Sequence, residues 1–110
     1  MLLTVLDSTG IVQTVITNGQ EAVTDNSGTI SATGVSQIIA VANSTRSGFF
    51  LQNVGANSMW FNELGSATET HGSVLLIPGA SVSAPKNYPV CINSLNLIGT
   101  SGEGFTLKQW

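Results

Sequence analysis

Short apolar runs of about four to six residues alternate along this chain with glycine, asparagine, serine and proline, at intervals of about ten residues. This spacing is typical of all-β sandwiches and barrels, whose strands are short and joined by tight turns. We therefore predict an all-β fold, an antiparallel β-sandwich or jelly-roll-like single domain. The expected strands are residues 2–6, 11–16, 20–24, 29–33, 37–42, 48–54, 58–62, 73–77, 80–84, 94–98 and 104–110.

Turn-forming residues separate these runs. Asp7–Gly10 suits a type I turn, and Asn18–Gly19 is a dipeptide that tolerates positive φ. Pro78–Gly79 suits a type II turn, in which proline sets φ and glycine takes the left-handed position. The segment 37–42 is ambiguous, because its apolar residues also match a helical spacing. Its shortness and β-branched content favour a strand.

The aromatic residues are distributed unevenly. All of them, and all three prolines, lie at or beyond Phe49. Because aromatic side chains bury the most surface per residue, the sandwich core is expected within residues 36–110. Residues 1–35 would then form an N-terminal arm or peripheral β-strands, two alternatives that the sequence leaves open. The expected core residues are Phe50, Trp60, Leu76, Leu97 and Phe105.

Charged residues make up only 8% of the 110 residues, with a net charge of −3. Soluble monomers usually carry far more surface charge, so self-association is expected, with a serine- and threonine-coated monomer as the alternative. Binding to nucleic acid is not expected, because it needs clustered lysine and arginine. An arm bearing the apolar residues Leu2, Leu3, Val5 and Leu6 offers unpaired backbone for strand addition and is the candidate subunit interface.

The single cysteine, Cys91, cannot form an intrachain disulfide and is expected to be a small buried side chain between Val90 and Ile92. The N-terminal segment lacks a basic region and its apolar run is short, so neither a secretory signal nor a membrane span is expected. These features predict a protein made in a cytoplasm.

No residue pattern indicates catalysis or a cofactor. The only histidine, His71, lies in a polar loop and no Gly-x-Ser-x-Gly elbow is present. Glu63, Glu69 and His71 do not have the spacing of a metal site, so a solvated loop is expected. Residues 99–104 lack the lysine and helix of a phosphate-binding loop, and a hairpin turn accounts for them. We predict a protein that is not an enzyme and uses no cofactor or metal.

Trp60, Tyr88 and Trp110 are the residues that could stack against sugar rings, although the run 59–61 is more typical of a core strand. Carbohydrate binding is therefore the alternative to a purely structural role.

The second half of the chain resembles the small β-sandwich modules of tailed-bacteriophage virion proteins, which include capsid decoration (cement) proteins, head fibres and tail-fibre attachment modules. The shared plan is an arginine before a strand ending in Leu-x-Asn-x-Gly, an aromatic strand, a Leu-x-Pro-Gly turn and a last strand after Gly-x-x-Gly. The matching residues are Arg46, Leu51, Asn53, Gly55, Trp60, Phe61, Leu76, Pro78, Gly79, Leu97, Gly99, Gly102, Phe105 and Trp110.

The resemblance implies a structural virion protein on the capsid surface. The absence of a long repetitive or coiled-coil stem favours a compact decoration protein over a fibre. The implied partners are other copies of the chain, with a trimer as the expected state, and the major capsid protein, with no nucleic acid and no membrane. The alternative that it implies is a tail- or head-fibre module that binds host-surface carbohydrate.

Overall fold

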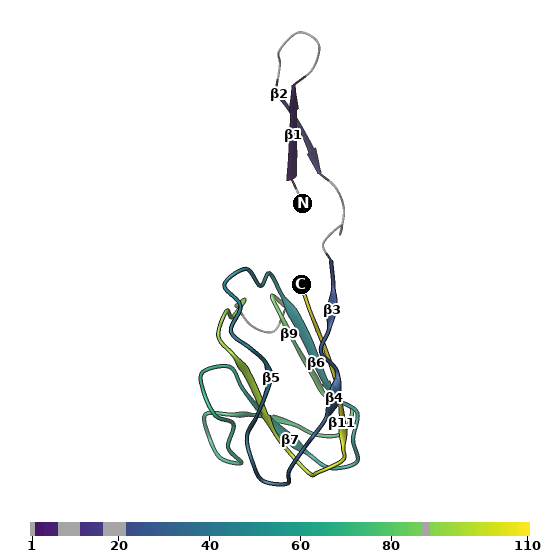
Figure 1. Ribbon diagram of the computed structural model, residues 1–110, viewed down its shortest axis with the longest axis vertical. Helices are drawn as coiled ribbons and strands as arrows, with labels where there is room; N and C mark the ends of the chain where they lie inside the picture. Colours follow the sequence, from purple (N-terminus) through teal and green to yellow (C-terminus); the bar gives the residue numbers. More distant parts are fainter. Residues whose placement is uncertain (1, 7–11, 17–21, 87–88) are drawn as a thin grey trace.

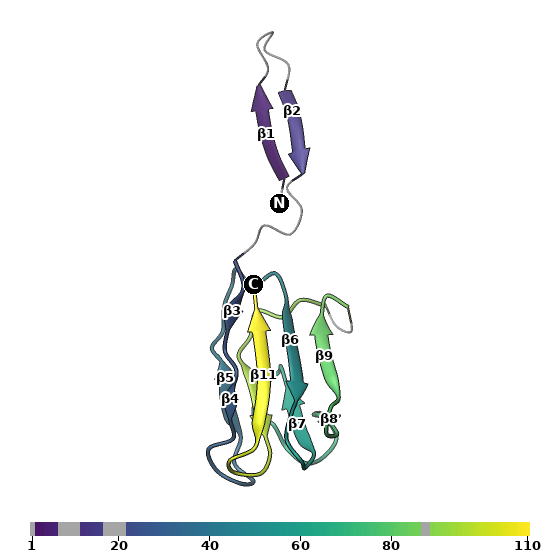
Figure 2. The ribbon, with the colours of Figure 1, turned by 90° about the vertical axis from the view of Figure 1, so that its right-hand side faces the viewer.

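The computed structural model describes residues 2–6, 12–16, 22–86 and 89–110, and every regular element in these ranges is a β-strand. Two antiparallel sheets pack face to face (Figures 1 and 2), which confirms the predicted all-β sandwich. The turns expected at residues 7–10 and 18–19 lie outside the described residues. The strands are β1 (Leu2–Leu6), β2 (Val12–Ile16), β3 (Thr24–Asp25), β4 (Gly28–Thr29), β5 (Gln37–Ala40), β6 (Phe49–Asn53), β7 (Met59–Asn62), β8 (Val74–Leu76), β9 (Ser81–Ala84), β10 (Leu95–Ile98) and β11 (Gly104–Gln109).

The strand order is that of a jelly roll. One sheet has the order β5-β10-β7-β8, and the other has β3-β11-β6-β9, with β4 also paired to β11. If β3 and β4 are counted as one interrupted edge strand, the chain forms four successive pairs whose members lie in opposite sheets: β3/β4 with β5, β6 with β7, β8 with β9, and β10 with β11. Most connections are therefore arches across the sandwich, and among the described strands of its two sheets only β7 and β8 are consecutive strands that pair with each other.

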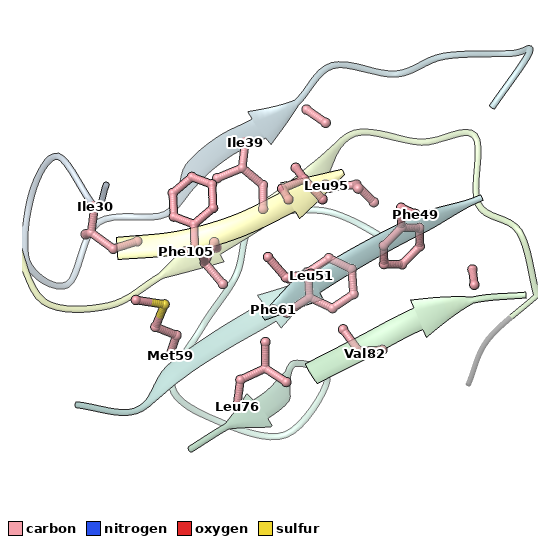
Figure 3. Packing of buried hydrophobic residues seen from close by; sticks show 14 residues of the cluster. Ile30, Ile39, Phe49, Leu51, Met59, Phe61, Leu76, Val82, Leu95 and Phe105 are labelled. Atoms are coloured by element: carbon pink, nitrogen blue, oxygen red, sulfur yellow. The ribbon is translucent and has the colours of Figure 1, made fainter. Parts of the chain in front are cut away.

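The core lies between the two sheets, and Phe49 contacts Phe61 across it with ring centroids 5.7 Å apart and planes inclined by 51°. Leu76, Leu97 and Phe105 are buried as predicted. Figure 3 shows Leu76 and Phe105 within the buried cluster. The core residues form one cluster: Ile30, Ile39, Ala40, Phe49, Leu51, Met59, Phe61, Leu76, Val82, Ala84, Leu95, Leu97, Phe105 and Leu107.

The prediction was wrong for two of the expected core residues. Phe50 and Trp60 are only half-buried, and the residues beside them in sequence, Phe49 and Phe61, occupy the core instead. Successive side chains of a strand point to opposite faces, so only one of two adjacent aromatics can point inward. In β6, Leu51 points inward together with Phe49, whereas Phe50 shares the outer face with the polar Gln52.

Local turn chemistry behaves largely as predicted. Residues 37–40 are a strand, not a helix. Pro78–Gly79 forms a type II turn, because Gly79 has φ of +85° and the Ala80 amide donates to the Ile77 carbonyl at 2.9 Å. Residues 99–104 form a turn, but the prediction that this turn belongs to a hairpin was wrong. The turn joins β10 to β11, which lies in the opposite sheet.

The first thirty residues contribute to two different structures. β3 and β4 form an edge of the sandwich beside β11, and Ile30 is buried in the core. The strand expected at 29–33 is much shorter than predicted, and of the strand expected at 20–24 only Thr24 belongs to β3 among the residues that the structure describes. β1 and β2 pair only with each other and form a separate two-stranded sheet (Figure 1).

Candidate interaction surfaces

The predicted interface residues all lie on β1. This strand pairs antiparallel with β2, and the register places Leu2 opposite Ile16, Leu3 opposite Val15 and Leu6 opposite Val12. Among the described strands, neither β1 nor β2 has a second neighbour, so each of these two strands has one edge without a strand partner. Isolated two-stranded hairpins are only marginally stable in water, and unpaired edges are templates for further strands. Binding to another surface would therefore stabilise the β1–β2 hairpin, and its unpaired strand edges are suited to that contact.

Arg46, the first of the residues on which the resemblance to virion modules rests, is buried and hydrogen-bonded to several parts of the chain. The side chain is only 4% exposed, and its guanidinium donates to the carbonyls of Val41 at 2.9 Å and of Cys91 and Asn93 at 2.8 Å. Its Nε donates to Gln109 Oε1 at 2.8 Å. Burial lowers the pKa of Arg46 from its ordinary value, but arginine stays charged in proteins. One cation thus ties two loops and the last strand together through neutral acceptors.

Asn53 and Gly55 organise the arch between β6 and β7. The Asn53 amide donates to the carbonyls of Asn57 and Leu76 at 2.8 Å and accepts from the Gly55 amide. The Glu103 carboxylate, from the β10–β11 arch, accepts from the backbone amides of Ala56 and Asn57 at 3.0 Å. These motif residues therefore serve the architecture and are not arranged around a ligand.

Trp110 covers the outer face of the β3-β11-β6-β9 sheet. A Cβ built at Gly48 would lie 2.5 Å from the Trp110 indole and 2.7 Å from the Ala84 carbonyl oxygen. Two backbone hydrogen bonds join Gly48 and Trp110, so the indole lies directly over the glycine. The half-buried Phe50 follows Gly48 on the same face, beside Lys108 on β11.

We expect Gly48→Ala to lower the free energy of unfolding by about 1–3 kcal/mol, because the new methyl group must displace both the indole and a backbone carbonyl. Gly65→Ala is the matched control, since a Cβ there meets nothing within 4 Å. The control should change stability by less than about 0.5 kcal/mol in urea denaturation. Equal effects of the two substitutions would contradict the close packing of Trp110.

The two tryptophans considered for stacking against sugar rings, Trp60 and Trp110, do not lie on one surface. Trp60 lies on the outer face of the opposite sheet, in register with Ile98 and Leu75, whereas Trp110 covers Gly48. Tyr88 lies outside the described residues. Phe50, which was predicted to lie in the core, is instead half-buried on the outer face of the sheet whose last strand is followed by Trp110.

Residues 63–73, which contain His71, cross the outer face of the β5-β10-β7-β8 sheet. The Ala67 amide donates to Ser36 Oγ at 2.8 Å, and Ala67 is buried. This loop explains why β10 is buried on both faces, including the polar Asn96. His71 itself is exposed, and in the ranges that the structure describes no three histidine, cysteine or acidic side chains gather as metal ligands would.

Cys91 was expected to be buried, and this was wrong. It is half-exposed and lines a surface pocket of about 330 Å³. Its Sγ lies 3.5 Å from the Glu63 carbonyl and accepts from the Asn93 amide at 3.3 Å. No local pattern of residues predicts this pocket, because its two segments are distant in the chain. The lining residues are Glu63, Leu64, Pro89, Val90, Cys91, Ile92 and Asn93.

The geometry defines a small jelly-roll sandwich with a separate hairpin of apolar sequence and an apolar pocket beside Cys91. Comparison of the chain with models of protein families, with curated proteins and with solved structures found no match. Within the described ranges, no helix has the length and apolar character needed to cross a membrane. The resemblance to virion modules stays a prediction.

Proposed function

We propose that this chain is a non-enzymatic structural protein of a tailed-bacteriophage particle, a capsid decoration protein that self-associates and bridges neighbouring major capsid subunits. The observation that carries the proposal is the apolar β1–β2 hairpin, which pairs only with itself and leaves a strand edge open on each side. Such an element gains stability when a neighbouring chain covers it. A trimer on the capsid surface is the form that the resemblance implies.

The surface charge supports an assembled state. Only three residues are lysine or arginine, and Arg46 is buried, which leaves Lys86 and Lys108 as exposed cations. A surface with so few charges is poorly protected against association and poorly suited to phosphate backbones. Several large apolar side chains outside the hairpin are also exposed, including Val41, Leu64 and Ile92.

A decoration protein would stabilise the capsid through the surface area that it buries against the capsid subunits. A specific protein interface buries roughly 1,200–2,000 Å². When a decoration protein covers the junction between capsid subunits, these contacts must break before the subunits separate. The jelly roll suits this role because its arches are tied by side-chain hydrogen bonds from Arg46, Asn53 and Glu103.

Deleting residues 1–17 tests this proposal. All residues of the buried core lie at Ile30 or later, so the shortened chain should stay folded. We expect it to sediment as a smaller species than the parent, and to bind undecorated shells at least about tenfold more weakly, because an interface and the avidity of an oligomer are both lost. Circular dichroism of the shortened chain provides the folding control.

A parent chain that is strictly monomeric and ignores shells would contradict the proposal. That result would favour the carbohydrate-binding alternative, a fibre module. Phe50 and Trp110 are the specific observation behind that alternative, since Gly48, over which the Trp110 indole lies, is two residues before Phe50, and Phe50 lies on an outer sheet face that also carries the polar Gln52.

A further inference from the structure

The pocket beside Cys91 is lined by apolar side chains that are unusually exposed to solvent. Leu64 is 77% exposed and Ile92 is 51% exposed, and both line this pocket of about 330 Å³. Val41 is 73% exposed, and its carbonyl binds the same guanidinium that holds Cys91 and Asn93. A pocket lined by exposed aliphatic side chains, on a small domain, marks an interaction site.

The pocket is held in shape by its backbone. Arg46 fixes the carbonyls of Cys91 and Asn93, and the Asn43 amide donates to the Ile92 carbonyl at 2.8 Å. The two segments of the wall approach where Cys91 Sγ meets the Glu63 carbonyl. Because these bonds restrain the loops, the apolar side chains have little freedom to fold inward and cover one another. A preformed surface also costs less entropy when a partner binds.

The β1–β2 hairpin has the matching chemistry. The strands read LLTVL and VQTVI, with no charged residue and with aliphatic residues at most positions. Glu63 is the only charged residue among those that line the pocket, and the other lining residues are uncharged and mostly apolar. A neutral, aliphatic strand fits both properties.

The hairpin is also placed to reach a neighbour. It contributes no strand to either sheet of the sandwich, and the described chain is 63 Å long against 22 and 20 Å in the other directions. Figures 1 and 2 show β1 and β2 beyond one end of the sandwich. A hairpin in this position presents its surface to other molecules.

We infer that the β1–β2 hairpin of one copy docks in the Leu64–Ile92 pocket of a second copy. This rests on the proposed homo-oligomer and names its contact. Pocket and hairpin are different surfaces of the chain, so the contact is heterologous and closes into a ring when the rotation between copies allows it. A ring of three copies would give the expected trimer.

Two matched substitutions test the pocket in the full-length chain. Ile92→Asp places a charge in the pocket, whereas Ile77→Asp places one at a similarly exposed isoleucine, 56% against 51%, outside the residues that line it. We expect sedimentation velocity to show that Ile92→Asp dissociates the oligomer and that Ile77→Asp leaves it intact. Equal assembly of the two variants overturns the inference.

Cys91 provides a direct readout of occupancy, because it is the only cysteine and it lines the pocket. Its alkylation by N-ethylmaleimide should slow as the protein concentration rises, by about tenfold when the concentration of free protein is roughly ten times the dissociation constant. Leu3→Asp in β1 should restore fast alkylation at all concentrations. Protection that does not depend on concentration, or that survives Leu3→Asp, overturns the inference.

The shell-binding experiment separates this inference from the proposed function. An oligomer that decorates shells while Cys91 stays fully reactive overturns the pocket contact and leaves the decoration role standing. An oligomer with protected Cys91 that ignores shells supports the pocket contact and overturns the decoration role.

Discussion

Replacing Phe49 with alanine is expected to lower the free energy of unfolding by about 3–5 kcal/mol, because a large aromatic side chain leaves a cavity in a packed core. Phe49 is 1% exposed, and its ring packs on Phe61 from the opposite sheet with centroids 5.7 Å apart. The substitution therefore removes a contact that joins the two sheets. Urea denaturation followed by far-UV circular dichroism measures the loss.

Phe50→Ala is the matched control, since it removes the same side chain one position along the same strand. Phe50 is half-buried on the outer face of the sheet, so its loss should cost about 1 kcal/mol. If Phe50→Ala destabilised the protein more than Phe49→Ala, the register of β6 against the core would be wrong. The same comparison applies to Phe61 and Trp60 in β7, with the inner residue carrying the larger effect.

These two strands also show why strand positions were easier to predict than strand faces. The positions followed from local turn chemistry, such as Pro78–Gly79, which acts within four residues. The inward faces of β6 and β7 were predicted wrongly, since Phe49 and Phe61 are buried in place of Phe50 and Trp60. Alternation alone pairs Phe49 with Leu51 on one face and Phe50 with the polar Gln52 on the other, so it identifies the inner face.

The pairing of strands depends on contacts between distant residues, which no local pattern contains. Residues 99–104 form a turn, but only the packed sandwich decides that the turn crosses between sheets. The pocket was missed for the same reason, since Leu64 and Ile92 are brought together by the fold. The chemistry of the hairpin could be predicted, because its apolar run is visible in the sequence.

Arg46 is the polar residue on which the loops around the pocket depend most. Replacing it with methionine keeps much of its volume but removes donors from the carbonyls of Val41, Cys91 and Asn93. Each of these three part-buried acceptors costs about 1–3 kcal/mol when it is left without a donor, so we expect a total loss of at least about 3 kcal/mol in the free energy of unfolding. Chemical denaturation of the two chains measures this difference.

Lys86→Met is the control, because it removes a cation from an exposed position and should change stability by less than about 0.5 kcal/mol. Arg46→Lys separates charge from geometry. Lysine restores the cation, but a single ammonium group cannot reproduce the planar fork that reaches three carbonyls and the Gln109 side chain at once. We therefore expect Arg46→Lys to recover only part of the stability. Full recovery would mean that the positive charge, and not the directed hydrogen bonds, holds the loops, and the wall of the pocket would then lack the rigid support that docking requires.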